Sequence, residues 1–457
     1  MWPDVATIPG ISDHQREQLA VATKRPLGIL TGGPGTGKTR TAAGIVAAIV
    51  QQYGAGSVAC CAPTGKAAVV ATAAMARMGL SIQSTTSHRL LGVQRNGHDG
   101  KGWGFIHGPG MPLPFRFLVI DEPSMLGTPL GSSIFSAIAP GTHILLVGDP
   151  YQLPPVEHGA PLRDMISAGI PTGKLTEIWR NDGGIVRACR LMKEGRGYQP
   201  SERIDVANGH NLRHYECRSA EQSLDVVRSL YRKAPPGVDR FADIQVLCTV
   251  REKSPLSVDC VNRMMQEFLL PDAERIDGIR FRVGDKVICT TNAMLALLDD
   301  EGNEIPDPFY TGSGKPEPKR DFVANGEIGR VIRLREKEMH VAIDAPKRTV
   351  KVGVIRSKSR KQEDEEQASK LSDFDLAYGI TIHKSQGSSW KCPIVLIDDY
   401  NGANFVACRE LYYTGVSRTE LLGFTIGRMD TINRHLQRVS LASRKTFLEE
   451  QLKGVAA

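Results

Sequence analysis

The stretch "GILTGGPGTGKTRTAAGIVAAIV", residues 28–50, decides the fold of this chain. Its first residues are apolar, its middle is rich in glycine, and its end is apolar and rich in alanine, which predicts a strand, a loop and a helix in that order. The loop fits the pattern G-x-x-x-x-G-K-[ST], with Gly32 and Gly37 at the two glycine positions. Such a loop wraps a polyphosphate with backbone N–H groups, and the following helix N-terminus adds positive potential. We therefore expect a phosphate-binding loop here.

The remaining residues of the loop define a nucleotide site. Lys38 is expected to reach the β- and γ-phosphates, and the Thr39 hydroxyl is expected to bind Mg²⁺. The residues expected to contact ATP are Gly33, Gly35, Thr36, Gly37, Lys38, Thr39 and Arg40. A glycine-rich turn without a ligand is the alternative, and the complete motif between a strand and a helix argues against it.

Polar residues follow two other apolar runs. Segment 115–125, "FRFLVIDEPSM", predicts a buried strand that ends in two acids. Asp121 would be the second Mg²⁺ anchor and Glu122 the base that orients and deprotonates water, with helix capping as the alternative for both. Segment 142–150, "THILLVGDP", predicts another strand, and Gln152 beyond it would bond the γ-phosphate or the attacking water. The alternative there is a common Gly-Asp-Pro turn.

Short apolar strands alternate with helical segments, which is typical of a parallel α/β sheet with ligands at the carboxyl ends of its strands. We expect a first α/β domain over residues 1–170, with a glycine- and proline-rich hairpin or loop at 92–114. A second α/β domain is expected over 171–275 and 372–457. Residues 276–371 interrupt it with short alternating strands and Gly or Asn turns, which predicts a small β-barrel insertion. The two α/β halves could be structurally related.

Composition restricts the partners and the compartment. The net charge of +7 over 457 residues permits a polyanionic partner but does not require one. Nine scattered cysteines without a CxxC pair indicate the reduced thiols of a cytosolic protein rather than a zinc cluster or a disulfide scaffold. The N-terminus lacks the pattern of a signal peptide, and no apolar run reaches the ~20 residues of a membrane span. We expect a cytoplasmic protein without a membrane partner.

Nine segments occur in an order that resembles the superfamily-1 helicases, specifically the RecD-like branch that includes RecD and the phage Dda helicase. They are "ISDHQREQLA", "GGPGTGKT", "APTGKAA", "TTSHRLLG", "IDEPS", "GDPYQLPPV", "LTEIWR", "AYGITIHKSQG" and "LYYTGVSRTE". They run over nearly the whole chain, and the co-linear set is much more specific than any one segment. Pro123 is a departure, because the branch usually has a small or β-branched residue there, and we expect it to leave hydrolysis intact.

The resemblance implies two RecA-like P-loop NTPase domains that sandwich ATP, with a pin-like insertion in the first and a small SH3-like β-barrel insertion in the second. It implies that Arg180 and Arg418 reach across the cleft and stabilise charge on the transferring phosphoryl group. It also implies that Gln15 contacts adenine and that Gly387 lies toward the ATP cleft.

For nucleic acid, the resemblance implies a track of phosphate contacts from both domains. The residues carried over are Pro63, Thr64, His88, Thr381, His383 and Lys384. A packed structural role is the alternative for the two histidines. In the pin, Trp103 and Phe105 are expected to stack on the duplex end, with a hydrophobic anchor under the loop as the alternative.

The resulting hypothesis is an ATP-dependent DNA helicase that uses ATP and Mg²⁺, translocates five-prime-to-three-prime on single-stranded DNA and opens forked or tailed duplex DNA. The direction is implied by the branch alone. We expect a stand-alone monomer in a bacterial or phage-infected cytoplasm, with replication or recombination proteins as candidate partners. The alternatives are a superfamily-1 RNA helicase and an ATP-binding module that remodels nucleic acid without productive unwinding.

Overall fold

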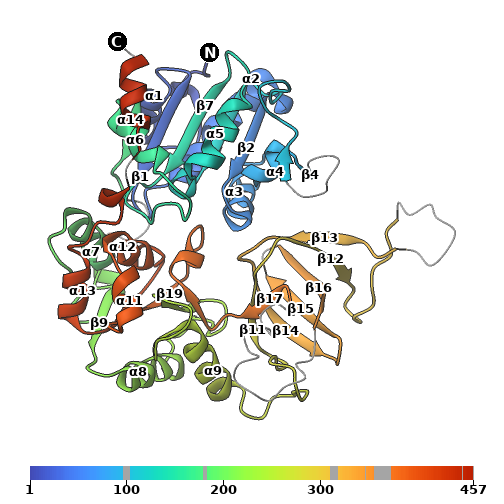
Figure 1. Cartoon of the computed structure of the whole chain (residues 1–457), viewed down its shortest axis with the longest axis vertical. Coiled ribbons are helices and arrows are strands. Elements are labelled where there is room, and N and C mark those ends of the chain that lie inside the picture. Colours follow the sequence, from blue (N-terminus) through green and yellow to red (C-terminus); the bar gives the residue numbers. More distant parts are fainter. Residues whose placement is uncertain are drawn as a thin grey trace.

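Two parallel sheets and one antiparallel sheet organise the molecule (Figure 1). The computed structural model describes residues 1–95, 103–178, 183–308, 317–344, 346–354, 372–444 and 446–455. The first parallel sheet forms from the N-terminal part of the chain, and the antiparallel sheet interrupts the second parallel sheet in sequence. The predicted α/β class with a β insertion is therefore confirmed.

The first parallel sheet has the strand order β3-β2-β6-β7-β1-β8. Its strands are β1 (Leu27–Gly32), β2 (Val58–Ala62), β3 (Ser84–Thr86), β6 (Phe117–Asp121), β7 (His143–Gly148) and β8 (Thr172–Leu175). Its helices are α1 (Asp13–Ala22), α2 (Lys38–Tyr53), α3 (Gly65–Arg77), α4 (Ser87–Leu91), α5 (Thr128–Ser136) and α6 (Pro161–Ser167). Neighbouring residues of β1 point to opposite faces, so Leu30 packs in the core that α2 covers and Ile29 in the core that α5 covers. Burial on both faces explains why these strands are apolar throughout.

The second parallel sheet repeats the topology of the first. Its strands, in spatial order, are β18 (Gly379–Thr381), β10 (Ile244–Cys248), β19 (Cys392–Leu396), β20 (Gly423–Gly427) and β9 (Leu212–Glu216). Numbered by their order in the chain they read 3-2-4-5-1, which is also the order of the first sheet apart from β8 at its edge. Its helices are α7 (Gly184–Glu194), α8 (Ala220–Arg232), α9 (Val258–Leu269), α11 (Asn401–Val406), α12 (Arg409–Ser417) and α13 (Met429–His435). We call the first sheet with α1–α6 the first unit, and the second sheet with these helices the second unit.

The chain returns to the first unit at its C-terminal end. Helix α14 (Leu448–Val455) lies beside α6, far from the helices that precede it in sequence (Figure 1). The Thr446 hydroxyl donates to Asp164 Oδ2 at 2.9 Å, and Arg444 Nη1 donates to the Gly159 carbonyl at 2.9 Å. The two units are thus joined by a returning segment as well as by the chain between β8 and α7.

The insertion is an antiparallel sheet that shares its core with the second unit. Its strands, in spatial order, are β13 (Arg320–Val323), β12 (Ala293–Leu298), β16 (Lys347–Gly353), β15 (Glu338–Asp344), β14 (Ile328–Leu334), β11 (Lys286–Cys289) and β17 (Phe374–Leu376). Val341 and Val350 of this sheet belong to the same buried cluster as Val246 of β10 and Met265 of α9. A continuous core fixes the insertion against the second unit.

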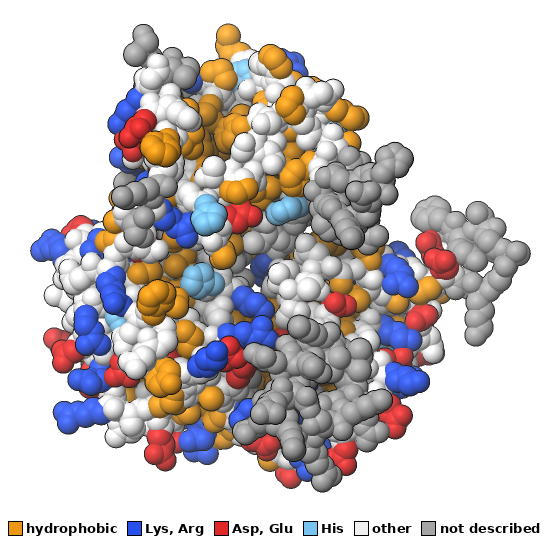
Figure 2. Space-filling model, in the orientation of Figure 1, with side chains coloured by type: hydrophobic (Ala, Val, Ile, Leu, Met, Phe, Trp, Pro, Cys, Tyr) orange, Lys and Arg blue, Asp and Glu red, His pale blue; other side chains and the backbone are white. Residues whose placement is uncertain are grey.

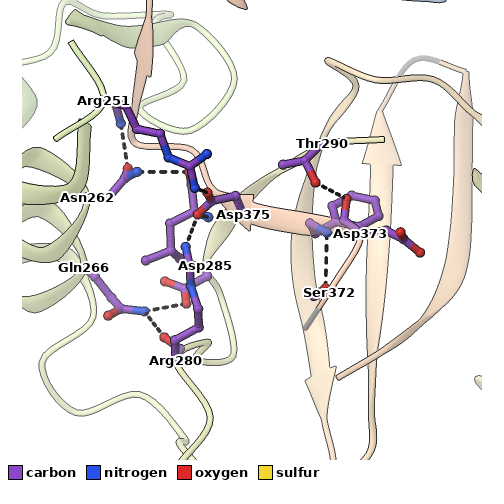
Figure 3. Close-up of polar contacts among 12 residues, drawn as sticks. Arg251, Asn262, Gln266, Arg280, Asp285, Thr290, Ser372, Asp373 and Asp375 are labelled. Carbon is purple, nitrogen blue, oxygen red and sulfur yellow. Dashed lines mark hydrogen bonds and ion pairs between the residues drawn. The ribbon is translucent and has the colours of Figure 1, made fainter. Parts of the chain in front are cut away.

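Polar contacts reinforce the junction between the insertion and the second unit (Figure 3). Gln266 Nε2 donates to Asp285 Oδ2 at 2.7 Å, and the Tyr378 hydroxyl donates to Asp285 Oδ1 at 2.8 Å. Asn262 Nδ2 donates to the Leu376 carbonyl at 3.0 Å, and Asn262 Oδ1 accepts from the Gly379 N–H at 2.8 Å. The Asn262 side chain therefore holds the end of β17 and the start of β18 next to each other.

The hairpin expected at 92–114 is described at its two ends. Strands β4 (Val93–Arg95) and β5 (Trp103–Phe105) pair antiparallel, and residues 96–102 lie outside the described residues.

All nine cysteines are free. Over the described ranges, no group of three or more His, Cys, Asp or Glu side chains is placed to hold a metal ion. No described helix is long and apolar enough to cross a membrane.

Close packing of α1 on the first sheet gives a stability prediction. A Cβ on Gly28 would lie 1.6 Å from the Ala22 carbonyl oxygen, where only backbone movement could relieve the clash. We expect Gly28→Ala to lower the free energy of unfolding by about 1–3 kcal/mol or more, measured by urea or thermal denaturation. Gly56→Ala is the matched control, because a Cβ there meets nothing within 4 Å. Equal unfolding midpoints for the two variants would contradict this packing.

Candidate nucleotide and nucleic-acid site

The phosphate loop, residues 32–39, connects β1 to α2. Gly35 and Gly37 have φ of +75° and +80°, a left-handed conformation that glycine adopts without a steric penalty. The Thr36 hydroxyl donates to the Gly33 carbonyl at 2.9 Å. These features explain why the sequence has glycine at these positions, and they curl the loop over the N-terminus of α2.

Lys38 lies over the start of the loop. Its Nζ donates to the carbonyl oxygens of Gly32 at 2.9 Å and of Gly33 at 3.0 Å. These two hydrogen bonds therefore hold the Lys38 ammonium group at the loop. A phosphate oxygen could replace these carbonyls, because a charged acceptor forms the stronger bond.

Gln15 joins the N-terminus of α1 to the phosphate loop. Its Oε1 accepts from the Ser12 N–H at 3.0 Å, as part of a capping box, and its Nε2 donates to the Thr36 carbonyl at 3.2 Å. Both ends of the amide are thus bonded within the first unit. Arg40, the last residue of the predicted set, is exposed on α2, and its Nη2 lies 3.8 Å from where a Cβ on Gly10 would be.

The two predicted acids lie beside the loop at the end of β6. Asp121 Oδ2 is 3.5 Å from the Thr39 hydroxyl, so the two predicted Mg²⁺ ligands are neighbours. Burial raises the pKa of the Asp121 carboxyl to about 7, and the charge of Glu122 adds to this increase. Glu122 Oε2 is buried and has no hydrogen-bond partner among the described residues. A hydroxyl, a carboxylate and an unbonded carboxylate oxygen form an oxygen donor set that fits Mg²⁺ and a bound water.

Pro123 is accommodated by a strained backbone. Glu122 has φ of +52°, and a left-handed conformation is costly for a residue with a Cβ that precedes proline. The Pro123 ring lies over Gly148 at the end of β7, where a Cβ would be 2.7 Å from Pro123 Cδ. The sequence departure is therefore matched by a glycine on the neighbouring strand.

The loop after β7 clasps the second unit. The Leu153 N–H donates to Thr414 Oγ1 at 2.9 Å, and the Leu153 carbonyl accepts from Gln386 Nε2 at 3.2 Å. The Leu153 side chain is buried in the core between α7, α12 and the second sheet. The Tyr413 hydroxyl donates to Asp149 Oδ2 within the same interface. We call these contacts the Leu153 clasp. Sequence patterns did not identify Leu153, Tyr413 or Thr414 as site residues.

Gln152 directly precedes Leu153 in the loop after β7. It is buried, and its Oε1 has no hydrogen-bond partner among the described residues. Its N–H donates to the Asp149 carbonyl at 3.3 Å. An unbonded amide oxygen is available to a ligand, as expected for a group that orients water.

Of the two predicted arginines, the structure describes Arg418, and its hydrogen bonds are to residues of the second unit. Arg418 is buried, and its guanidinium donates to the Thr414 carbonyl at 3.1 Å and the Ser388 carbonyl at 3.2 Å. These partners belong to the second unit. Arg180 lies outside the described residues.

The segment 379–387 faces α3 of the first unit. Thr381 Oγ1 accepts from the Lys384 N–H at 3.2 Å, and a Cβ on Gly387 would lie 3.2 Å from Ala67 Cβ. Burial lowers the pKa of His383, and it lowers the pKa of Lys384 with a further contribution from the Arg251 charge. Gly387 thus contacts α3 rather than the phosphate loop.

In the first unit, three of the residues predicted to contact nucleic acid, Pro63, Thr64 and His88, lie at the N-termini of α3 and α4. Pro63 is half-buried after β2, and Thr64 Oγ1 caps α3 by accepting from the Ala67 N–H at 3.3 Å. His88 is exposed, with its ring centroid 6.1 Å from that of Phe105. Phe105 packs against the core of the first unit, which matches the anchor alternative. The Trp103 side chain lies outside what is described.

The insertion also contacts the first unit. A Cβ on Gly65, the first residue of α3, would lie 2.4 Å from Ala324 Cβ. The Arg89 guanidinium lies 5.6 Å from the Phe322 ring centroid. The N-terminus of α3 is therefore bordered by the insertion on one side and by segment 379–387 on another.

Comparison with known proteins agrees with this geometry. Residues 10–214 match a family model described as an AAA domain, and residues 376–422 match one described as a UvrD-like helicase C-terminal domain. The chain is 31% identical over 425 residues to the ATP-dependent RecD2 DNA helicase of Deinococcus radiodurans, which covers 92% of this chain and 49% of that protein. It is 28% identical to the RecBCD enzyme subunit RecD of Mycolicibacterium smegmatis, over 99% of this chain and 77% of that protein.

Among solved structures, the Pif1 helicase from Bacteroides in complex with ADP-AlF3 and single-stranded DNA has the same fold. The TM-score is 0.51 at 16% identity, covering 98% of this chain and 97% of that one. The chain spans about half the length of the RecD2 relative (49%). Sequence and fold therefore agree: the chain is similar in sequence to the helicases RecD2 and RecD over most of its length, and its fold is similar to that of the Pif1 helicase.

Proposed function

We propose that this protein is an ATP-dependent DNA helicase that translocates five-prime-to-three-prime on single-stranded DNA and separates duplex DNA. The observation that carries the proposal is the Leu153 clasp. Gln386, which bonds the Leu153 carbonyl, is two residues from Lys384 in the segment proposed to hold nucleic acid. The segment beside the nucleotide acids and the segment proposed to hold DNA are thus directly bonded, as a motor requires.

The proposed ATP chemistry assigns a task to each residue of the loop. Lys38 binds the β- and γ-phosphates, and Thr39 and Asp121 hold Mg²⁺, which neutralises charge on the phosphates. Glu122 accepts a proton from the attacking water, whose oxygen Gln152 orients. Arg418 and Arg180 stabilise the transferring phosphoryl group when the units close. In this scheme Arg418 leaves its present carbonyl partners to reach the nucleotide.

The proposed architecture is that of two RecA-like domains over residues 1–170 and over 171–275 with 372–457. The strand order 3-2-4-5-1 shared by the two sheets supports their common origin. We assign an SH3-like fold to the insertion at 276–371 and the role of a strand-separating pin to residues 92–114. The contacts of the insertion with α3 support a role in enclosing the DNA.

The proposed DNA track runs between the two units. Pro63, Thr64 and His88 contribute from the first unit, and Thr381, His383 and Lys384 from the second. Figure 2 shows Lys, Arg and His side chains around the hollowed middle of one face. Burial lowers the pKa of Lys384, the Arg251 charge adds to this decrease, and a DNA phosphate beside Lys384 would favour its charged form. The proposed partners are single-stranded DNA and forked or tailed duplexes, bound by a monomer in the cytoplasm, with replication or recombination proteins as candidates.

Unwinding of tailed duplexes tests the direction and the substrate. With ATP and Mg²⁺, we expect release of the displaced strand from a DNA duplex with a five-prime tail, and little from one with a three-prime tail or from blunt duplex. Matched RNA duplexes provide the comparison for an RNA helicase. Preference for a three-prime tail would refute the direction, and ATP turnover without strand release on any substrate would favour a remodelling module.

Glu122→Gln tests the base. The variant should bind ATP, because Lys38 and Thr39 remain, and hydrolyse it about 10²- to 10⁴-fold more slowly, because a general base is lost. Single-turnover hydrolysis and nucleotide binding measure the two steps separately. The control is Glu17→Gln, an exposed acid on α1 of the same unit. Wild-type turnover in Glu122→Gln would contradict the assignment, and Lys38→Ala should lose ATP binding altogether.

Thr414→Val tests the clasp. Thr414 is fully buried, and the substitution leaves the Leu153 N–H without its acceptor at a cost of about 1–3 kcal/mol. We expect the ratio of DNA-stimulated to basal ATPase to fall. In the control Thr419→Val, the lost hydroxyl is one that donates to the Val416 carbonyl near the end of α12, and the ratio should be retained. An unchanged ratio in Thr414→Val would show that the Leu153 clasp does not couple DNA binding to ATP hydrolysis.

A further inference from the structure

Lys193, in the last turn of α7, extends from the second unit to the phosphate loop of the first. A Cβ built on Gly33 would lie 3.3 Å from Lys193 Nζ and 3.7 Å from the Tyr413 hydroxyl oxygen. The Gly33 carbonyl accepts a hydrogen bond from Lys38 Nζ on the same loop. Two ammonium groups, one from each unit, therefore face a single residue of the phosphate loop.

Aromatic rings from both units surround the Lys193 ammonium. Its Nζ lies 4.6 Å from the Tyr151 ring centroid and 5.1 Å from that of Tyr413. Asp149 fixes both tyrosines, because its Oδ1 accepts from the Tyr151 N–H at 3.1 Å and its Oδ2 accepts from the Tyr413 hydroxyl. The negative end of the α7 dipole also favours a cation at this position. These contacts therefore hold the Lys193 amine in one position.

The Lys193 charge is available to a ligand. In the part of the chain that the structure describes, its ammonium group lies near the two rings and Gly33, and no carboxylate forms an ion pair with it. Rings attract a cation but carry no net charge, so they do not neutralise it. Arg418, by contrast, has its guanidinium bonded to carbonyls of its own unit.

We propose that Lys193 binds the terminal phosphate of ATP from the second unit, an inference that rests on the proposed ATP site at Lys38. In loops of this pattern the motif lysine reaches the β- and γ-phosphates, and Lys193 faces the same loop residue as Lys38. A contact made from the opposite unit exists only while the units are close together. Lys193 would then make the affinity for ATP depend on closure, whereas ADP lacks the phosphate that it binds.

Nucleotide binding to three variants tests the proposal. Lys193→Gln removes the positive charge, Lys193→Arg keeps a positive charge at the same position, and Arg190→Gln removes an exposed charge from the same helix. Calorimetry with a non-hydrolysable ATP analogue and with ADP gives both affinities. We expect Lys193→Gln to weaken the analogue about 10- to 100-fold, as for loss of a charged hydrogen bond, and to leave ADP binding unchanged. Lys193→Arg should recover most of the loss, and Arg190→Gln should match the wild type.

The outcomes separate this proposal from the proposed function. Wild-type affinity for the analogue in Lys193→Gln, or an equal loss for ADP, would overturn the role of Lys193 even if the protein is an active helicase. A wild-type protein that binds no nucleotide would refute the ATP site itself. Lys193→Met keeps the aliphatic stem on the tyrosine rings, and it provides the same test if Lys193→Gln has a lowered unfolding midpoint.

Discussion

The two hydrogen bonds of the Leu153 backbone are the constraint on which the rest of the site depends. One peptide unit of the first unit donates to Thr414 and accepts from Gln386, both of which belong to the second unit. The Leu153 side chain is buried in the core of that unit, so neither bond can be exchanged for water without exposing apolar surface. In the proposed function, these packed and bonded groups would transmit movement at the nucleotide acids to segment 379–387.

The two parallel sheets share one strand order, but different loops follow their corresponding strands. In the first sheet, β1 leads into the glycine loop and Lys38. In the second sheet, β9 occupies the corresponding place, and the residues that follow it, Cys217, Arg218 and Ser219, include no glycine or lysine. The second unit instead contributes groups that reach the first, such as Tyr413 and Lys193. In the proposed function, the first unit would bind the phosphates, and the second would contribute residues that contact them only when the two units are close together.

The sequence predicted those features that depend on local spacing. The phosphate loop can be predicted because it needs glycines at two left-handed positions. The acids can be predicted because they follow an apolar strand in a series of alternating strands and helices. Lys193, Thr414 and Leu153 lack such a pattern, because their roles arise where segments far apart in the chain meet. The left-handed backbone at Glu122 has no signal in the sequence beyond Pro123, which departs from the pattern of the resembled branch. For Gln15 and Gly387, the structure gives contacts that the motif alone did not imply, with Thr36 and Ala67.

Coupling between nucleotide and nucleic acid is the central claim, and it is tested most directly by measuring the affinity for a single-stranded DNA oligonucleotide in two nucleotide states. Fluorescence anisotropy with saturating ADP and with a saturating non-hydrolysable ATP analogue gives the two values. The account predicts that they differ by about fivefold or more, and that DNA changes the relative affinity for the two nucleotides by the same factor, as linkage requires. Identical DNA affinities in the two states would contradict it.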